Sequence, residues 1–120
     1  MSKTIKKTSF EMLDAGNVRI DSIKKSTGYG GSFGADSYAS IHLTDFESDF
    51  SALKNPRVVA VIVEDADNAG NYYMNPGWIK ATKSGSSYTL YLYLLKSFGG
   101  MTFGSDYSVY VELIVASDPE

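Results

Sequence analysis

The side chains that could perform catalysis in this chain are few, and they stand far apart in the sequence. His42 is the only histidine, and none of the serines stands in a motif that marks an activated nucleophile. Glu64 and Glu112 lie in otherwise apolar segments, and two carboxylates that face each other could hydrolyse a glycosidic bond. We favour a structural interpretation of these residues. The histidine is expected on the outer side of a strand, and the glutamates at strand ends or at an interface. We therefore expect a protein that is not an enzyme and that uses no cofactor.

A second segment whose side chains could bind a metal ion is the acidic segment Glu64–Asn71, which partly follows the spacing of a calcium-binding loop. Asp65 and Asp67 stand at the first two ligand positions of such a loop. The next ligand position is Ala69, however, and Pro76 stands where a bidentate glutamate is required. We therefore predict a turn and no metal site, because aspartate, asparagine and glycine tolerate the left-handed backbone of turns.

The composition of the chain narrows its function class. Its 120 residues fit a single domain, residues 1–120, and 43% hydrophobic residues allow an ordinary buried core. A net charge of −3 with Arg19 and Arg57 as the only arginines argues against nucleic-acid binding, which depends on lysine and arginine. The absence of cysteine excludes disulfides, thiolate zinc sites and cysteine nucleophiles.

Neither a secretory signal nor membrane insertion is predicted. The first residues, M-S-K-T-I-K-K, are basic, but no apolar stretch follows them, and no apolar run approaches transmembrane length. We therefore expect synthesis in a cytoplasm, followed either by residence there or by incorporation into a virion that is released by lysis.

Aromatic residues are frequent and gather partly in two glycine-rich segments, Ser26–Asp36 and Phe98–Gly104. Glycine allows a tight turn and a close approach by a ligand, and loops at the end of a sandwich are a usual place for recognition. Aromatic faces can stack on the apolar faces of sugars; the competing interpretation is that these side chains plug the ends of the domain. We predict a ligand site composed of Tyr29, Phe33, Tyr72, Tyr73, Trp78, Phe98, Met101 and Phe103.

Alternating apolar residues and frequent turn signals predict that short strands position these loops. We expect an all-β protein, an antiparallel β-sandwich of about six to eight strands, with residues 1–14 as an N-terminal arm or an edge strand. Asp45–Lys54 is compatible with one or two helical turns, or with an irregular segment in which Phe46 and Phe50 plug the sandwich. The expected strands are 18–23, 37–43, 58–63, 72–74, 78–82, 88–95 and 107–115.

Several expected strands carry apolar side chains on both faces, although a monomeric antiparallel sandwich needs only one apolar face per strand. In segment 88–95, the leucines at even positions share one face, while Tyr91 and Tyr93 share the other. If the last strand lies beside this one, the exposed patch reaches the size of about 300–600 Å² that a monomer rarely exceeds. Cover by the N-terminal segment or by the Phe46–Phe50 segment is the alternative. We predict a homo-oligomer whose interface contains Tyr91, Tyr93, Tyr110, Ile114, Val59 and Val61.

The order and apolar spacing of the segments from Ile41 onward resemble the H-type lectin and phage tail-fibre tip pattern. The matching segments are I-H-L-T-D-F-E-S-D-F, N-P-R-V-V-A-V-I-V, W-I-K-A-T, S-Y-T-L-Y-L-Y-L and Y-S-V-Y-V-E-L-I-V-A. The resemblance implies a sandwich of the H-type lectin-like or immunoglobulin-like kind, a homotrimer, and binding of a cell-surface carbohydrate or another receptor. It also implies that strands 57–64, 86–96 and 107–115 lie near the trimer contact. None of the family's sugar-contacting residues matches this chain position by position.

The expected function is therefore recognition. We expect an oligomeric structural or receptor-binding protein of a phage virion, which binds a cell-surface carbohydrate or another receptor through its glycine-rich aromatic loops. Two alternatives stay open from the residues alone. One is a purely architectural virion protein that decorates a capsid or connects tail parts, and the other is a cellular carbohydrate-binding module.

Overall fold

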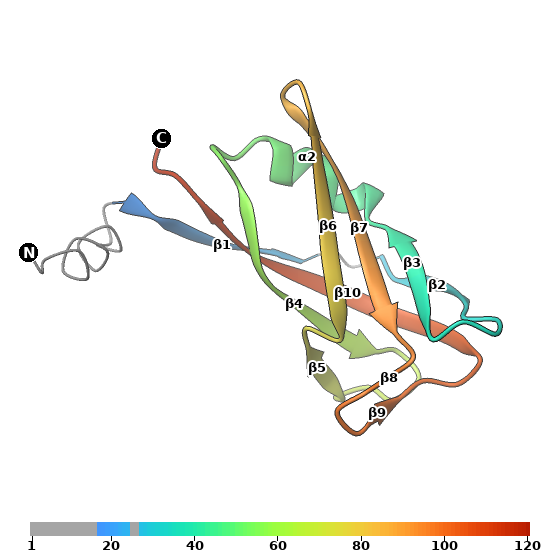
Figure 1. The fold of residues 1–120 in the computed structure, drawn as a ribbon. Coiled ribbons are helices and arrows are strands. Elements are labelled where there is room, and N and C mark those ends of the chain that lie inside the picture. The colour runs from blue at the N-terminus through green and yellow to red at the C-terminus, as the bar shows by residue number, and fades with distance from the viewer. Residues whose placement is uncertain (1–16, 25–26) are drawn as a thin grey trace, which may run out of the picture.

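The computed structural model describes residues 17–24 and 27–120, so the predicted N-terminal arm or edge strand, residues 1–14, lies outside the described residues. Within the described part of the chain, nearly all regular structure is β, and one α-helix stands between strands (Figure 1). The elements are, in chain order, β1 (Arg19–Lys24), β2 (Tyr29–Ser32), β3 (Tyr38–His42), α2 (Thr44–Ser51), β4 (Arg57–Asp65), β5 (Tyr72–Met74), β6 (Gly77–Ser84), β7 (Ser87–Leu95), β8 (Ser97–Phe98), β9 (Met101–Thr102) and β10 (Asp106–Ser117).

The strands form two antiparallel layers and a small hairpin (Figure 1). The larger sheet has five strands in the order β1-β10-β4-β5, with β2 pairing to β10 beyond the end of β1. The smaller sheet has three strands in the order β3-β7-β6, and β8 pairs with β9. The prediction of an all-β antiparallel sandwich is confirmed.

The core of the sandwich lies between the two sheets and follows from strand alternation. Every second residue of β10 from Tyr107 to Val115 points inward and is buried. From the opposite layer, Leu90, Leu92 and Leu94 of β7 point inward and are fully buried. The intervening residues of both strands point outward, so each sheet presents a second face to its surroundings.

The two strands with apolar outer faces, β7 and β10, belong to different sheets. The assumption that their outer faces lie side by side is therefore wrong. Tyr91 and Tyr93 point outward from the smaller sheet, whereas Tyr110 and Ile114 point outward from the larger one. Alternation assigns a residue to one face of its strand, but it does not say which strand lies beside it.

The ambiguous segment after β3 forms helix α2, and its phenylalanines also plug the core. Phe46 and Phe50 are both fully buried. From the same helix, a Glu47 Oε2 oxygen accepts the N–H of Leu90 at 2.7 Å, and Ser51 Oγ accepts the N–H of Tyr88 at 3.0 Å. The helix thus satisfies backbone donors of β7 beyond the point where β3 ends.

The two glycine-rich segments contain strands, where open loops were expected. Residues 29–32 form β2, and residues 97–102 form the β8–β9 hairpin. A Cβ added at Gly31 would come within 2.6 Å of the hydroxyl oxygen of Tyr107, closer than real Cβ contacts allow. Glycine at this position therefore lets β2 lie against the Tyr107 ring, which is a packing role.

Candidate functional site

The outer face of the smaller sheet carries a continuous group of ring side chains, which we call the aromatic face. Its members come from all three strands, and the strand register brings them together. Tyr91 lies opposite His42 of β3 and opposite Lys80 of β6, and Tyr93 lies opposite Trp78 of β6. The aromatic face consists of Tyr38, His42, Trp78, Tyr91 and Tyr93.

The rings of the aromatic face stack on one another. The centroids of Trp78 and Tyr93 are 5.2 Å apart with planes at 14°, and those of His42 and Tyr91 are 4.6 Å apart with planes at 15°. Tyr91 and Tyr93 connect these two pairs at 6.3 Å. Tyr38 contacts both Trp78 and Tyr93 with rings inclined to theirs. Contacts at about 4.5–7 Å are favourable for aromatic pairs, so the group holds itself in one arrangement.

The end of the aromatic face at Trp78 is open. The Trp78 side chain is 48% exposed, although it is the largest side chain of the group. The indole stacks on Tyr93 and contacts Tyr38, and no described strand pairs with the outer edge of β6, on which Trp78 lies. A Cβ added at Gly77, whose φ is 149°, would overlap the carbonyl oxygen of Tyr93. Glycine before Trp78 therefore permits the close approach of β6 to β7 on which this stacking depends.

The other end of the aromatic face is polar. His42 Nε2 lies 2.9 Å from Glu47 Oε2, and the same carboxylate oxygen accepts the N–H of Leu90. The carboxylate is thus fixed by the backbone of β7, and it helps to hold the His42 ring against Tyr91. Lys80 adds a cation opposite Tyr91. The aromatic face therefore combines ring faces with a rim of hydroxyl, imidazole, carboxylate and ammonium groups.

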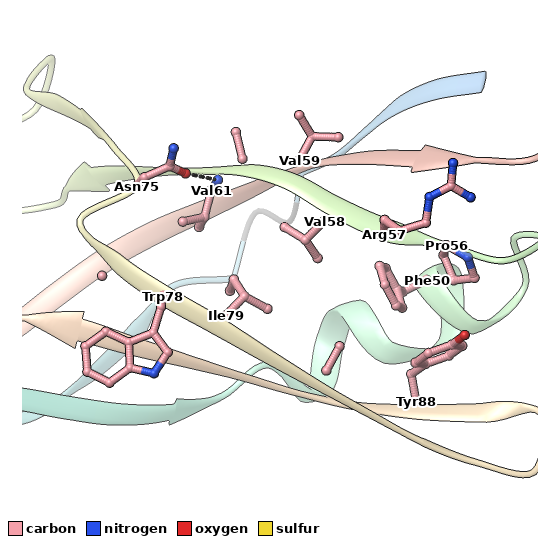
Figure 2. A pocket seen from close by; sticks show the side chains of 13 residues that line it. Phe50, Pro56, Arg57, Val58, Val59, Val61, Asn75, Trp78, Ile79 and Tyr88 are labelled. Carbon is pink, nitrogen blue, oxygen red and sulfur yellow. Dashed lines mark hydrogen bonds between the residues drawn. The ribbon is translucent and has the colours of Figure 1, made fainter. Parts of the chain in front are cut away.

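A groove lies beside the aromatic face, between β4 and β6, with a cavity volume of about 460 Å³ (Figure 2). Asn75 stands at one end, where its N–H donates to the carbonyl oxygen of Val61 at 2.7 Å and its Oδ1 accepts the N–H of Val61 at 2.8 Å. From Val61 back to Arg57, no described strand pairs with this edge of β4, because β5 ends at Met74. The apolar walls are formed mainly by Phe50, Pro56, Val58, Val59, Ile79 and Tyr88, and Trp78 of the aromatic face also lines the groove.

The chemistry of this groove differs from that of the aromatic face. Its charged side chain, Arg57, lies 2.9 Å from Asp118, and its amide side chain, Asn75, is bound to β4. The groove therefore suits apolar groups better than a ligand rich in hydroxyls. On its other side, β6 carries Lys80 and Lys83, and lysines on an edge strand disfavour the addition of another strand.

Burial contradicts the ligand-binding role that was predicted for Phe33, Met101 and Phe103. None of the three is more than 5% exposed. The ring of Phe33 packs against Phe103 at 6.0 Å and against Tyr107 at 5.3 Å. These side chains plug the end of the sandwich, which was the competing interpretation. Phe98, in contrast, is 52% exposed on the β8–β9 hairpin.

The structure separates the remaining members of the predicted ligand site. Tyr29 is half-buried, and this burial raises the pKa of its hydroxyl. Tyr73 packs its ring against Phe103, whereas Tyr72 is exposed on β5. Trp78 alone belongs to the aromatic face. The predicted set therefore does not form one site.

The predicted oligomer interface is also divided. Val61 is 2% exposed and belongs to the core, so a role in contacts between copies is contradicted. Val59 is exposed at the groove. Sequence reasoning missed Tyr38 and His42 as members of a site. Alternation does turn them outward, but only the register of β3 against β7 brings them to the tyrosines.

The acidic segment forms the predicted turn. Asp65 Oδ1 accepts the N–H of Asp67 at 3.0 Å, and Asp65 Oδ2 accepts the side-chain amide of Asn68 at 3.2 Å. Among residues 17–24 and 27–120, no three histidine, cysteine, aspartate or glutamate side chains gather so that they could hold a metal ion. Glu64 and Glu112 both lie on the outer side of the larger sheet, beside a hollow of only about 20 Å³, which is too small for a sugar ring.

Comparisons with protein-family models, with curated proteins and with solved structures give no match for this chain. Of the helices in the described part of the chain, none is both long enough and apolar enough to cross a membrane.

Proposed function

We propose that this chain is a non-enzymatic recognition protein that binds a carbohydrate on the aromatic face. The observation that carries the proposal is the stacked array on the smaller sheet, in which Trp78 is held by Tyr93 and is still 48% exposed. The proposed ligand would lie on a sheet face and not at the glycine-rich segments, since Phe33 and Phe103 in those segments are buried.

The chemistry of a sugar fits this surface. One face of a sugar ring carries C–H groups that pack on an indole, while its hydroxyls both donate and accept hydrogen bonds around the edge. The tyrosine hydroxyls, His42, Glu47 and Lys80 supply partners of both kinds around the rings. Because the rings already hold one another in place, few side-chain rotamers would be lost on binding, which favours affinity.

We extend this proposal to the setting that the family resemblance implies. The protein would be a structural or receptor-binding component of a phage virion, and its ligand a cell-surface glycan. The all-β sandwich and the exposed rings support this setting. A purely architectural virion protein would bind assembled particles and no glycan, so a direct binding experiment separates the two.

The test is a glycan array with labelled protein, followed by calorimetric titration of the glycan that binds best. Trp78→Ala should weaken binding at least about tenfold, equivalent to about 1.4 kcal/mol, because the exposed stacking surface is lost. Phe98→Ala is the matched control, since it removes an equally exposed ring from the β8–β9 hairpin. Its affinity should equal that of the unmodified protein.

Two results would overturn the proposal. If the unmodified protein binds no glycan on the array while it does bind virion particles, the architectural function takes its place. If Phe98→Ala weakens glycan binding and Trp78→Ala does not, the site belongs to the hairpin. Far-ultraviolet circular dichroism of each variant verifies that the sheets are intact.

A further inference from the structure

The outer face of the larger sheet exposes isolated apolar side chains, and no described segment covers it. The exposed fractions are 65% for Met74, 60% for Ile20 and 58% for Tyr72. We call this surface the apolar face; it consists of Ile20, Ile62, Tyr72, Met74, Tyr110 and Ile114.

Strand pairing arranges the apolar face in rows that run across the sheet. One row is Tyr110, Glu64 and Tyr72. The next row is Lys24, Glu112, Ile62 and Met74. The hollow between these rows has a volume of only about 20 Å³, so no cleft divides them. A sheet face without a cleft is suited to packing against another sheet face.

The size of this surface is that of a protein contact. The twelve residues of β10 make the sheet roughly 40 Å long at about 3.3 Å per residue. Four strands lie side by side only in the row of Lys24, because β5 has 3 residues; along most of β10, two or three strands at a spacing of about 4.8 Å make the sheet roughly 10–15 Å wide. The resulting area of several hundred Å² is that of a small interface, below the roughly 800 Å² that each partner contributes to a standard one, so association is expected at high concentration.

The apolar face carries one ammonium group, Lys24, and two carboxylates, Glu64 and Glu112. Lys24 lies on the edge strand β1, and Glu64 lies on β4, on the other side of β10 and in the neighbouring row. A two-fold axis parallel to the strands would place Lys24 of one copy over the β4–β5 side of the other, in the row beside Glu64, and symmetry would form this pair twice. Glu112, on β10 between β1 and β4, accepts a hydrogen bond from the Ser22 hydroxyl of its own chain, so its carboxylate already has a partner.

We propose that the apolar face binds a second copy of this chain, and that the result is a two-fold symmetric dimer with both aromatic faces directed outward. This contact uses a different sheet from the proposed glycan site and does not depend on the class of ligand. It presents two recognition surfaces per assembly, which raises the avidity for a multivalent surface. The resemblance implies a trimer, but a self-complementary face is closed by two copies.

The test is the mass of the full chain in solution, measured by sedimentation equilibrium over a wide range of concentrations. We expect twice the chain mass at high concentration. Met74→Glu and Tyr110→Glu should each weaken self-association at least tenfold, because they place further negative charge in an apolar contact. Phe98→Glu is the matched control, since it adds the same charge at an exposed apolar position on the hairpin, and it should leave the dimer intact.

A charge exchange provides a stricter criterion. Lys24→Glu alone should weaken the dimer, and the double variant Lys24→Glu, Glu64→Lys should restore it, which a general loss of stability would not do. A monomer at every concentration, a trimer mass, or a dimer unaffected by Met74→Glu would overturn the proposal. Self-association that requires removal of residues 1–16 would also overturn it, because it would assign the face to that segment. Glycan binding measured on the same variants shows separately whether the aromatic face functions.

Discussion

The aromatic face and the apolar face are both outward surfaces of antiparallel sheets, yet they expose apolar atoms differently. On the aromatic face ring covers ring, so Tyr91 and Tyr93 are half-buried by their neighbours. On the apolar face, Met74 and Ile20 are both at least 60% exposed. Phenol, indole and imidazole groups can form hydrogen bonds with water at their edges. Isoleucine side chains cannot, and the methionine sulfur is only a weak acceptor.

The difference shows that two largely apolar surfaces can suit different partners, one a polar ligand and the other an apolar protein surface. A surface of stacked rings with polar edges is tolerated in water and remains available to a polar ligand. A surface of separate apolar side chains, of which Met74 and Ile20 are the most exposed, is stabilised when another apolar surface covers it. The single strand pattern that suggested one large interface therefore divides into one recognition surface and one association surface.

Of the substitutions that test this comparison, Gly77→Ala is expected to have the largest effect on stability and on the aromatic face. The added methyl group would overlap the carbonyl oxygen of Tyr93, and alanine is strained at a φ of 149°. We expect a loss of about 2–5 kcal/mol in the free energy of unfolding, measured by urea denaturation. Displacement of β6 should also abolish glycan binding, because Trp78 would no longer stack on Tyr93.

Gly85→Ala is the control for the effect of backbone strain alone. Gly85 has a φ of 63°, and no atom lies within 4 Å of an added Cβ. We expect this variant to lose only about 1–2 kcal/mol, the usual cost of a left-handed residue that carries a side chain. Equal losses for the two variants would show that the contact between β6 and β7 contributes nothing at Gly77.

A smaller effect is expected from Glu47→Ala at the polar end of the aromatic face. The change removes the acceptor of the Leu90 N–H and the partner of His42. A part-buried donor without an acceptor costs about 1–3 kcal/mol, which urea denaturation would detect. Glu47→Gln retains a side-chain acceptor and should lose clearly less. If glutamine and alanine have the same effect, the negative charge matters more than the hydrogen bond to β7.

The strands of both faces could be predicted from the sequence, because alternation is a local property. Leu90, Leu92 and Leu94 face the core as predicted, and Tyr91 and Tyr93 face outward. The acidic turn was also predictable, since Asp65 forms its side-chain hydrogen bonds with residues two and three positions later. In each case the pattern lies within one segment of the chain.

The composition of the two faces could not be predicted, because it depends on which strands pair. Tyr38 and Trp78 are forty residues apart, and they meet only because β3 and β6 both pair with β7. The burial of Phe33 has a similar origin, since β2 pairs with the distant β10 and brings Phe33 against Tyr107. A glycine-rich segment therefore indicates either a flexible loop or a close backbone contact, and the sequence does not distinguish them.

The smallest expected effect concerns an ion pair at the end of the larger sheet, outside both faces. Arg57 Nη1 lies 2.9 Å from Asp118 Oδ1. The hydrogen bond from Arg57 lowers the pKa of the Asp118 carboxyl below its usual value. Because the folded pKa is depressed, the pair stabilises the protein above the unfolded pKa of about 3.9 and loses this effect as pH falls through the folded pKa.

Asp118→Asn should therefore lower the urea midpoint slightly at neutral pH, and the difference should vanish in acid and shrink in high salt, because this pair is exposed. Measurement of the midpoint from pH 7 down to acid pH would test this. A difference that persists in acid would mean that the asparagine side chain disturbs the sheet end by itself. Because Asp118 belongs to neither face, the variant should bind glycan and dimerise like the unmodified protein. It thereby serves as a control in which stability falls slightly while binding by both faces stays the same.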